Sequence, residues 1–585
     1  MRFLLGYGSC GIASGAQTVL KGLEKAFEGT DYIVEKVGCN GLCFAEPIVE
    51  VVTDSGESFL YGRLNETTAI ELAESVKKGE LPLNNRLSDE EMAFLNGQKR
   101  IVLSGCGKID PENIESYIEN GGYTALKTAL SMGAEKIIEE IKISGLRGRG
   151  GAGFPTYIKW QSARNSVAEE KYIVCNADEG DPGAFMDRAV LEGDPHRVLE
   201  GMMISGIAVG ASTGIIYVRA EYPLAVKRLK MAIEQMREKG ILGDNIFDSG
   251  FSFDFRIMMG AGAFVCGEET ALLASLGGNR GMPVTKPPFP AQKGFRKQPT
   301  NINNVETFAN VSWIIENGGA AFASMGTDGS KGTKVFALAG RVKRGGLVEV
   351  PMGLTINEIV FDICGGIKED AEIKAVQMGG PSGGCIPKDM LDTPIDYENI
   401  AKTGAIMGSG GMIVMDEKTC MVDMAKFFMD FTSKESCGKC VPCRIGTTRM
   451  LEILERIVKG EGEESDIETL VDLGESIKTG ALCGLGNSAP NPVLTTIKYF
   501  RNEYEAHIKE KCCPAKKCTA LIEYKIDANK CKGCSLCSKK CPVEAISGQI
   551  KSPYTIDAQK CIRCGECIST CKFGAIEVLS GEGME

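Results

Sequence analysis

The sequence lacks any run of about 18 uncharged apolar residues, the length that a membrane-spanning helix needs. Its first residues, MRFLLGYGSCG, are interrupted too early to form the apolar stretch of a signal peptide. We therefore expect a cytoplasmic protein without direct membrane insertion. A dense stripe of lysine and arginine is also lacking, and the net charge of −11 is spread along the chain. This charge pattern predicts no nucleic-acid partner.

The length of 585 residues predicts about four domains, since one domain takes roughly 100–200 residues. Hydrophobic residues make up 43% and charged residues 24%, which is typical of a globular protein with packed cores. Glycine is abundant, with 72 residues, and much of it stands in short runs such as GLRGRGGAGF. Such runs suit close approach of the backbone to a ligand.

Cysteine is concentrated at one end of the chain. Of 24 cysteines, 15 lie from Cys437 onward, and many are separated by only two residues. Disulfide scaffolds of this density are short secreted domains, whereas a large chain without an export signal more often holds such thiolates on metal. The pattern therefore predicts metal ligation.

Hydrophobic periodicity divides the chain into segments of different character. Short apolar runs alternate with helical patterns at the start, a polar linker follows, and a longer α/β stretch comes next. A compact β-grasp-like module, a helical region and a short repetitive tail complete the chain. The expected fold is multidomain α/β and α+β, with domains at 1–80, 100–325, 326–415, 416–505, 506–525 and 526–585.

The tail contains two copies of the bacterial ferredoxin motif. In this motif three closely spaced cysteines bind one [4Fe–4S] cluster, and the fourth ligates the other cluster of the pair. Zinc knuckles, the alternative, would have wider gaps between cysteine pairs. One cluster is thus predicted on Cys531, Cys534, Cys537 and Cys571, and the other on Cys561, Cys564, Cys567 and Cys541.

A third group of cysteines precedes this tail. The stretch ESCGKCVPCR again spaces three thiolates by two residues, and the helical region supplies one more in ALCGLGN. Four sulfurs fit a third [4Fe–4S] cluster, with the ligands Cys437, Cys440, Cys443 and Cys483.

One of only two histidines, His507, is followed closely by Cys512, Cys513 and Cys518. These residues remain after the three clusters have been assigned. Two interpretations stay open: a structural zinc, with His507, Cys513 and Cys518 among its ligands, or unligated thiols at a domain hinge.

Two glycine loops are candidates for ligand binding. GRGGAG at 148–153 matches G-x-G-x-x-G, but an amphipathic helix precedes it where a Rossmann loop would follow a strand. The loop can still offer backbone N–H groups to a phosphate as a concave nest. The second loop, GAGAFVCGEET at 260–270, follows a strand and opens a helical run. Alone, either loop is weak evidence.

Together with ESCGKCVPCR, these loops resemble the NADH-binding flavoprotein subunit of respiratory complex I and its soluble relatives in hydrogenases and formate dehydrogenases. The resemblance covers about residues 100–505. It implies an NAD(P)H-linked oxidoreductase subunit with FMN bound by Gly148, Arg149, Gly150, Gly151, Gly153, Lys159, Asn176, Asp178, Glu179, Gly267, Glu268, Asn303 and Asn304. It places NAD(H) against Phe154, Phe264, Glu269, Lys286 and Phe289.

The chemistry is consistent with this resemblance. Hydride transfer belongs to the flavin and nicotinamide, so no protein acid or base is required, and the sequence has only two histidines. If Glu269 lies near the adenosine ribose, its charge disfavours a 2′-phosphate. We therefore favour NAD over NADP.

Cys10, Cys39 and Cys43 resemble the ligands of the thioredoxin-like [2Fe–2S] domain of the same enzyme systems. A fourth cysteine normally follows the first by about five residues, but Gly15 stands there. Two interpretations stay open: three thiolates that hold a cluster with an outside ligand, or a scaffold that has lost its cluster.

A thioredoxin-like front, a flavoprotein core and a ferredoxin tail in one chain most resemble the beta subunit of soluble, electron-bifurcating [FeFe]-hydrogenases. This implies three partners: a hydrogenase-type catalytic subunit, a small thioredoxin-like [2Fe–2S] subunit and ferredoxin. The alternatives are the NADH-input subunit of a formate dehydrogenase or respiratory complex, and an electron relay without nucleotide turnover.

Overall fold

The computed structural model describes residues 1–581, and the chain divides into two compact units. The first unit comprises Met1–Ala371, Ala375–Val414 and Leu482–Leu485, and the second contains Glu372–Lys374, Met415–Ala481 and the residues from Gly486 onward. Within residues 1–581, no helix has both the length and the apolar character needed to cross a bilayer.

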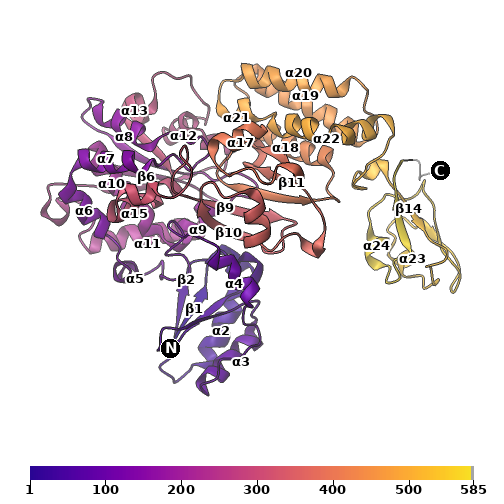
Figure 1. The fold of residues 1–585 in the computed structure, drawn as a ribbon, viewed down its shortest axis with the longest axis horizontal. Helices are drawn as coiled ribbons and strands as arrows, with labels where there is room; N and C mark the ends of the chain where they lie inside the picture. The colour runs from indigo at the N-terminus through magenta and orange to yellow at the C-terminus, as the bar shows by residue number, and fades with distance from the viewer. Residues whose placement is uncertain (582–585) are drawn as a thin grey trace. The chain divides into compact units, whose positions relative to one another are not determined.

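The first unit begins with a four-stranded sheet in the order β2–β1–β3–β4. β1 and β2 are parallel, whereas β3 pairs antiparallel with both β1 and β4. Phe3, Leu5, Val49 and Val51 alternate along β1 and β3 and are fully buried in one core with α2 and α3, which lie beside this sheet in Figure 1. The elements are β1 (Arg2–Gly6), α1 (Ser9–Ala13), α2 (Ala16–Ala26), β2 (Ile33–Val37), β3 (Val49–Val52), β4 (Ser58–Tyr61) and α3 (Glu66–Lys77).

The expected polar linker contains an ordered helix, α4 (Asp89–Asn96). The helix begins at a capping box, in which the Ser88 side chain accepts from the Glu91 N–H and the Glu91 carboxylate accepts from the Ser88 N–H. Phe94 is fully buried and packs edge-on against Phe44, with ring centroids 5.4 Å apart. The polarity of this stretch therefore comes from the exposed face of a docked helix.

The centre of the first unit is a fully parallel sheet in the order β7–β6–β5–β8. Its strands are mostly apolar because helices cover the sheet. Helix α10 has 13 of its 15 residues buried, so it lies within the core. The main elements are α5 (Ile114–Glu119), α6 (Thr124–Met132), α7 (Ala134–Ser144), α8 (Thr156–Asn165), β5 (Tyr172–Ala177), α9 (Met186–Gly193), α10 (Pro195–Val209), β6 (Thr213–Arg219), α11 (Pro223–Glu238), β7 (Asp254–Gly260), η3 (Phe264–Gly267), α12 (Glu269–Leu276), α13 (Pro290–Lys293), β8 (Thr300–Asn304), α14 (Val305–Ala309), α15 (Val311–Asn317) and α16 (Gly319–Ala323).

A mixed five-stranded sheet follows in the order β10–β9–β13–β11–β12. β9 pairs antiparallel with β10 and parallel with β13, and β11 pairs antiparallel with β12. The segment between β10 and β11 includes a short π-helix, η5. The elements are β9 (Thr333–Gly340), β10 (Gly346–Pro351), η5 (Glu358–Ile363), β11 (Ile373–Met378), β12 (Gly384–Pro387), α17 (Tyr397–Thr403) and β13 (Gly411–Asp416).

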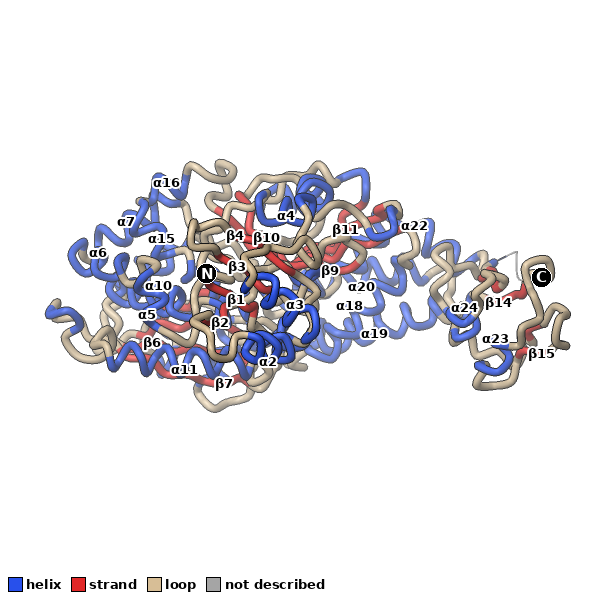
Figure 2. Tube along the Cα trace, turned by 90° about the horizontal axis from the view of Figure 1, so that it is seen from below, coloured by secondary structure: helices blue, strands red, loops and turns tan. Residues whose placement is uncertain are grey.

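The second unit consists of long helices followed by a small cysteine-rich fold. Helices α18, α19 and α20 lie side by side (Figure 2), and their apolar faces share one core with α22. In the tail, β14 pairs with β17 and β15 with β16, while α23 packs on α24. The elements are α18 (Met421–Glu435), α19 (Val441–Val458), α20 (Asp466–Gly480), α22 (Asn491–Lys509), β14 (Glu523–Ile526), α23 (Leu536–Lys540), β15 (Ile546–Ser547), β16 (Thr555–Ile556), α24 (Glu566–Thr570) and β17 (Ile576–Leu579).

Candidate functional site

The strand order of the parallel sheet defines a switch point between β5 and β8. From β5 the chain proceeds through β6 and β7 on one side, and it then returns to place β8 on the other side. Ligands of open parallel sheets bind beyond the carboxyl ends of the strands at such a point. Asn176 at the end of β5 stands in register with Asn304 at the end of β8. Both are predicted flavin residues, so the structure brings them to the expected edge.

The first glycine loop, residues 145–154, connects α7 to α8 and reaches the same edge. The Gly148 N–H donates to the Phe154 carbonyl at 2.9 Å, which closes the loop. A Cβ at Gly150 would come within 3.1 Å of the Asn304 Cβ, so this loop packs directly on the end of β8. Gly153 has φ +61° and faces the Tyr397 ring, where a Cβ would approach to 2.7 Å. Both backbone conformation and space therefore require glycine at position 153.

Arg149 has a different environment from the glycines beside it. Its side chain is fully buried, and its guanidinium donates to the carbonyls of Thr333 at 3.0 Å, Lys331 at 2.6 Å and Arg147 at 3.0 Å. Its backbone N–H donates to Thr307 Oγ1 at 2.9 Å. Arg149 thus fixes the loop to the start of β9 and to the residues just before it.

The second glycine loop lies beside the end of β5. The Asn176 side-chain amide donates to the Gly267 carbonyl at 2.9 Å, and the Asp178 N–H donates to Asn176 Oδ1 at 3.2 Å. Glu268 caps α12, because its Oε2 accepts from the N–H groups of Thr270 at 2.9 Å and Ala271 at 3.0 Å. The two glycine loops and the two asparagines therefore border one region.

A charged group links α8, α12 and the segment before α13. Glu269 pairs with Lys159 at 3.2 Å and with Lys286 at 2.8 Å, while Lys286 lies 3.4 Å from Glu268. Burial acts to raise the pKa of Glu269, but the two lysines outweigh burial and lower it. Lys159 also donates to the Ile302 carbonyl at 2.6 Å, which ties this group to β8.

Buried carboxyl groups lie behind the asparagines. Glu179 accepts from the N–H groups of Asp187 at 3.0 Å and Arg188 at 3.1 Å, and burial raises its pKa. Burial, followed by the charges of Glu179 and Glu306, raises the pKa of Asp187 well above its usual range. The Asn304 amide donates to Asp187 Oδ2. Burial therefore makes the charged form of both carboxyl groups less favourable than it is in water.

The remaining residues predicted to bind flavin or nucleotide differ in how far they are exposed to solvent. Asn303 is buried, and its Oδ1 accepts from the indole of Trp160 and from the amide of Asn301, each at 2.9 Å. Phe154 and Phe289, by contrast, are exposed residues at 49% and 52%, so both are accessible to a ligand. The Phe264 ring packs close to Gly180, where a Cβ would meet it at 3.1 Å.

Three cysteines of the ESCGKCVPCR stretch mark the start of α19. Cys440 is the N-cap of this helix, and Cys443 is buried in its first turn. Ser436 Oγ lies 3.2 Å from Cys443 Sγ, and the Arg444 guanidinium donates to the Gly438 carbonyl at 2.6 Å across the loop that carries Cys437. Cys483 stands directly before the short helix α21 (Gly484–Ser488).

The ferredoxin-like tail has a pocket that cysteines from both runs line. Cys541, the last cysteine of the first run, lines this pocket together with Cys561, Cys564 and Cys567 of the second run. The side chains of Ile546, Ile556 and Ile562 complete its apolar wall. Cys531, Cys537 and Cys571 pack in the same apolar cluster as Cys541 and Cys567.

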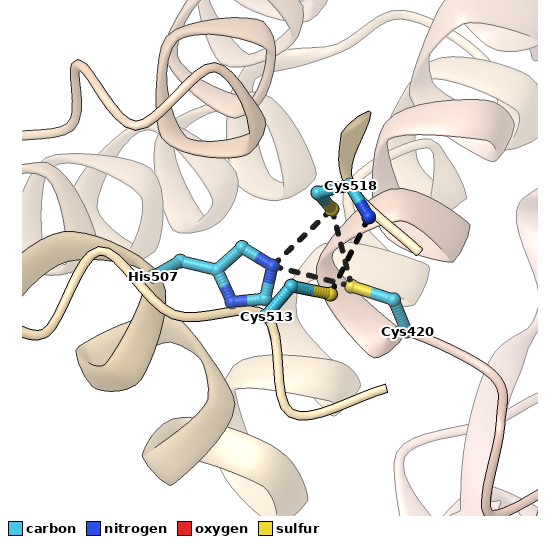
Figure 3. Close-up of side chains that lie close together, drawn as sticks. All are labelled: Cys420, His507, Cys513 and Cys518. Atoms are coloured by element: carbon cyan, nitrogen blue, oxygen red, sulfur yellow. Dashed lines mark hydrogen bonds between the residues drawn. The ribbon is translucent and has the colours of Figure 1, made fainter. Parts of the chain in front are cut away.

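Four ligand-type side chains meet inside the second unit: Cys420, His507, Cys513 and Cys518 (Figure 3). All four are buried, and their ligand atoms lie within 4.8 Å of one another. His507 Nε2 lies 3.4 Å from Cys420 Sγ and 3.3 Å from Cys518 Sγ, and the two sulfurs are 3.7 Å apart. A tetrahedral zinc with metal–sulfur bonds of about 2.3 Å separates its sulfurs by about 3.8 Å.

Sequence reasoning found three members of this group and missed Cys420. Cys420 is the N-cap of α18 and stands alone in its segment, so no local spacing marks it. The signal available was a set of two cysteines and one histidine that still needed a fourth ligand. Cys512, which is also close to His507 in the sequence, lies outside the group and beside Gly581.

The three N-terminal cysteines also come together. Cys43 hydrogen-bonds with both Cys10 and Cys39. Hydrogen bonding from Cys43, together with the nearby Arg188 guanidinium, lowers the pKa of Cys10 to about 6. Arg188 lies 3.6 Å from Cys10 Sγ, and the Gly41 N–H donates to Cys39 Sγ at 3.4 Å. Gly15 begins α2 and brings no side chain to this group.

Three protein-family models match parts of this chain. The Nuo51 FMN-binding domain matches residues 141–313, the NADH-ubiquinone oxidoreductase-F iron–sulfur binding region matches 423–507, and a 4Fe-4S dicluster domain matches 530–575. The fold and these matches define an NAD(P)H-linked oxidoreductase subunit with FMN and [4Fe–4S] clusters.

The chain belongs to the Nuo51 family of complex I flavoprotein subunits. It is 59% identical to the NADP-reducing hydrogenase subunit HndC of Solidesulfovibrio fructosivorans over 78% of this chain and 93% of the relative. An NADH-quinone oxidoreductase subunit of Rhizobium meliloti is 45% identical over 71% of this chain and 99% of its own length. A solved NAD⁺-reducing [NiFe]-hydrogenase in the H2-reduced state matches with a TM-score of 0.63 and 30% identity, over 87% of this chain and 84% of that chain.

Proposed function

We propose that this chain is the diaphorase subunit of a multisubunit hydrogenase, where it exchanges hydride between NAD(H) and FMN and single electrons with iron–sulfur clusters. The observation that carries the proposal is the meeting of both glycine loops with Asn176 and Asn304 at the switch point of the parallel sheet. FMN, when bound, supplies the conversion between two-electron and one-electron transfer. The protein supplies position and charge.

The predicted flavin residues divide into two groups by their contacts. Gly148, Gly150, Gly151 and Gly153 would present backbone to the phosphate and ring, and Lys159 would add a positive charge. Asn176, Asp178, Glu179, Gly267, Glu268, Asn303 and Asn304 would surround the remaining edge. The three backbone carbonyls that accept from the Arg149 guanidinium support a positioning role for this residue instead of flavin contact.

The nucleotide would lie over the flavin, with Phe154, Phe264 and Phe289 as apolar cover. The exposure of Phe154 and Phe289 supports this role, because a buried ring could not contact a nucleotide. Glu269 would face the adenosine ribose, and Lys286 would hold the Glu269 carboxylate in place. HndC is named as NADP-reducing. For this chain we propose NAD over NADP, because the negative charge of Glu269 would disfavour a 2′-phosphate on the ribose.

The metal centres proposed are three [4Fe–4S] clusters and one zinc. The pocket shared by Cys541 with Cys561, Cys564 and Cys567 supports the crossed ligation of the tail. The cluster at the start of α19 would use Cys437, Cys440, Cys443 and Cys483. The buried tetrad of Cys420, His507, Cys513 and Cys518 fits zinc in charge, ligand type and spacing, so we favour zinc over free thiols.

The proposed assembly is cytoplasmic and contains a hydrogenase-type catalytic subunit, a small thioredoxin-like [2Fe–2S] subunit and ferredoxin. The two hydrogenase relatives support the catalytic partner. The strand orders of the N-terminal sheet and of the five-stranded sheet support the thioredoxin-like and β-grasp-like assignments. Bifurcation between ferredoxin and NAD in an [FeFe]-hydrogenase is the specific version of the proposal, and the ferredoxin-like tail would be the docking module.

The test is anaerobic reduction of the full, cluster-reconstituted chain with NADH and, separately, NADPH. Flavin absorbance and EPR are recorded for each nucleotide. Bleaching of the flavin followed by cluster signals is the expected result. If FMN and clusters are present but neither nucleotide reduces them, the chain is an electron relay and the proposal is wrong.

A further inference from the structure

The N-terminal cysteine group contains a fourth potential ligand, the carboxylate of Glu46. Glu46 follows Cys43 by three residues, at the end of the short η1 helix (Cys43–Ala45). Its Oε1 lies 3.5 Å from Cys39 Sγ. Its Oε2 is buried and has no hydrogen-bond partner among residues 1–581. A buried carboxylate oxygen without a partner is costly, so its position calls for a ligand.

The backbone near this carboxylate leaves room for it. A Cβ at Gly11 would lie 2.6 Å from the Gly6 carbonyl and 3.1 Å from Glu46 Oε2, and a Cβ at Gly8 would lie 3.1 Å from the Cys39 Cβ. Any larger residue at position 11 would therefore displace the carboxylate or the strand end. Glycine at these positions keeps Glu46 close to the sulfurs.

Two other charged side chains near the cysteines, Glu192 and Arg188, are less suited to bind a metal. Both oxygens of Glu192 are used by Ser9, with 2.8 Å to its N–H and 2.6 Å to its hydroxyl. Arg188 is a cation that contacts Cys10 and can balance negative charge but cannot act as a ligand. Glu46 differs from Glu192, because its Oε1 lies beside Cys39 while its Oε2 has no hydrogen-bond partner among the described residues.

The distances between the ligand atoms of these residues suit a centre with two irons. Two pairs of neighbours can be distinguished, Cys10 with Cys43 and Cys39 with Glu46, and each pair can share one iron. A tetrahedral metal with bonds of about 2.3 Å to sulfur and about 2.0 Å to oxygen separates the two ligand atoms by about 3.5 Å. The observed distance from Cys39 to Glu46 has this value.

We propose that Glu46 is the fourth protein ligand of an N-terminal [2Fe–2S] cluster, which would be held by Cys10, Cys39, Cys43 and one carboxylate. Replacement of thiolate ligands by other donors has a precedent in Rieske centres, where two histidines bind one iron and change the potential. The proposal deepens the electron-transfer function proposed above. It removes the need for an outside ligand at the place of the missing cysteine.

The experiment uses the full reconstituted chain and four variants: Glu46→Gln, Glu46→Cys, Glu192→Gln and Cys39→Ser. Iron per chain is measured, and EPR is recorded after dithionite reduction, at a temperature where fast relaxation broadens the [4Fe–4S] signals. Dithionite makes the result independent of NADH, so failure of the nucleotide site would be seen separately. Mössbauer spectra then compare the two iron sites.

We expect Glu46→Gln to lose two irons per chain and the [2Fe–2S] signal, as Cys39→Ser does, while Glu192→Gln keeps both. Glu46→Cys should keep the cluster but shift its EPR and make its two iron sites alike. The proposal is overturned if Glu46→Gln retains the wild-type iron and spectrum, if Glu46→Cys leaves the spectrum unchanged, or if wild type holds no more iron than Cys39→Ser.

Discussion

His507 Nε2 lies 3.4 Å from Cys420 Sγ, although the two residues are 87 positions apart in the sequence. The other ring nitrogen, Nδ1, is 2.7 Å from the Glu503 carbonyl, which turns Nε2 toward the sulfurs. This contact joins the start of α18 to the end of α22. A metal here would cross-link two helices of the second unit.

We predict that Cys420→Ser lowers bound zinc from one equivalent to a small fraction and destabilises the second unit. Removing one of four ligands weakens the site, and structural zinc contributes directly to folding. A loss of about 3 kcal/mol would lower Tm by roughly 6–12 °C for a unit of this size. Metal analysis and thermal unfolding, with and without a chelator, measure both effects.

Cys512→Ser is the matched control, because Cys512 is next to Cys513 in sequence and lies outside the tetrad. It should keep its zinc and its Tm. Equal zinc in both variants would contradict a role for Cys420 as a ligand.

Cys420 and the cysteines of the tail show which metal ligands the sequence can predict and which it cannot. Ferredoxin cysteines lie two residues apart, so spacing alone predicts their chemistry. Cys420 joins its site only through tertiary packing of α18 on α22, which no local pattern encodes. Arg149 is similar, because its place in a glycine motif suggested ligand contact, while its guanidinium also donates to the carbonyls of Lys331 and Thr333 in a distant segment. Helix α4 within the expected polar linker was not predicted, because Phe94 is the buried residue of this helix and one residue sets no apolar periodicity.

We predict that Cys541→Ser affects the cluster of the second cysteine run. Cys541 lines the pocket with Cys561, Cys564 and Cys567, so its loss should produce the same missing EPR signal as Cys564→Ser. Cys534→Ser should remove the other tail cluster. If Cys541→Ser instead matches Cys534→Ser, each run binds its own cluster and the crossed ligation is wrong.

We predict that Gly153→Ala abolishes FMN retention. The new methyl group would approach the Tyr397 ring to 2.7 Å in a left-handed backbone conformation, which forces the loop to move. Flavin released on denaturation, relative to protein, measures occupancy. Gly210→Ala is the control, since Gly210 also has positive φ but no atom within 4 Å of its added Cβ. It should cost about 1 kcal/mol of stability and keep FMN.

We predict that the first unit becomes less stable as pH rises from about 4.5 to about 7, because of Glu200. Burial raises the pKa of Glu200 from 4.5 to about 7, and its oxygens face the Tyr117 hydroxyl and the Leu126 N–H, with Glu316 nearby. The folded state therefore keeps a proton that the unfolded state has lost in this range. This difference amounts to at most about 3 kcal/mol.

Glu200→Gln mimics the protonated form, so it should flatten this part of the pH profile. Thermal unfolding at pH 5 and pH 8 measures the effect, and the variant should gain more over wild type at pH 8. An equal change in Tm at the two pH values would show that Glu200 does not titrate in this way.

The charge of Glu269 should set nucleotide preference. Its carboxylate is held between Lys159 and Lys286, so Glu269→Gln removes one negative charge and leaves two lysines without their shared partner. A 2′-phosphate near this group would then meet less repulsion and more attraction. We expect the ratio of kcat/KM for NADH to that for NADPH to fall by about tenfold, which corresponds to about 1.4 kcal/mol.

Glu234→Gln, which removes an exposed pairing with Arg237 on α11, should leave the ratio unchanged. If both variants behave alike, the ribose lies away from Glu269, and the preference must come from another part of the nucleotide site.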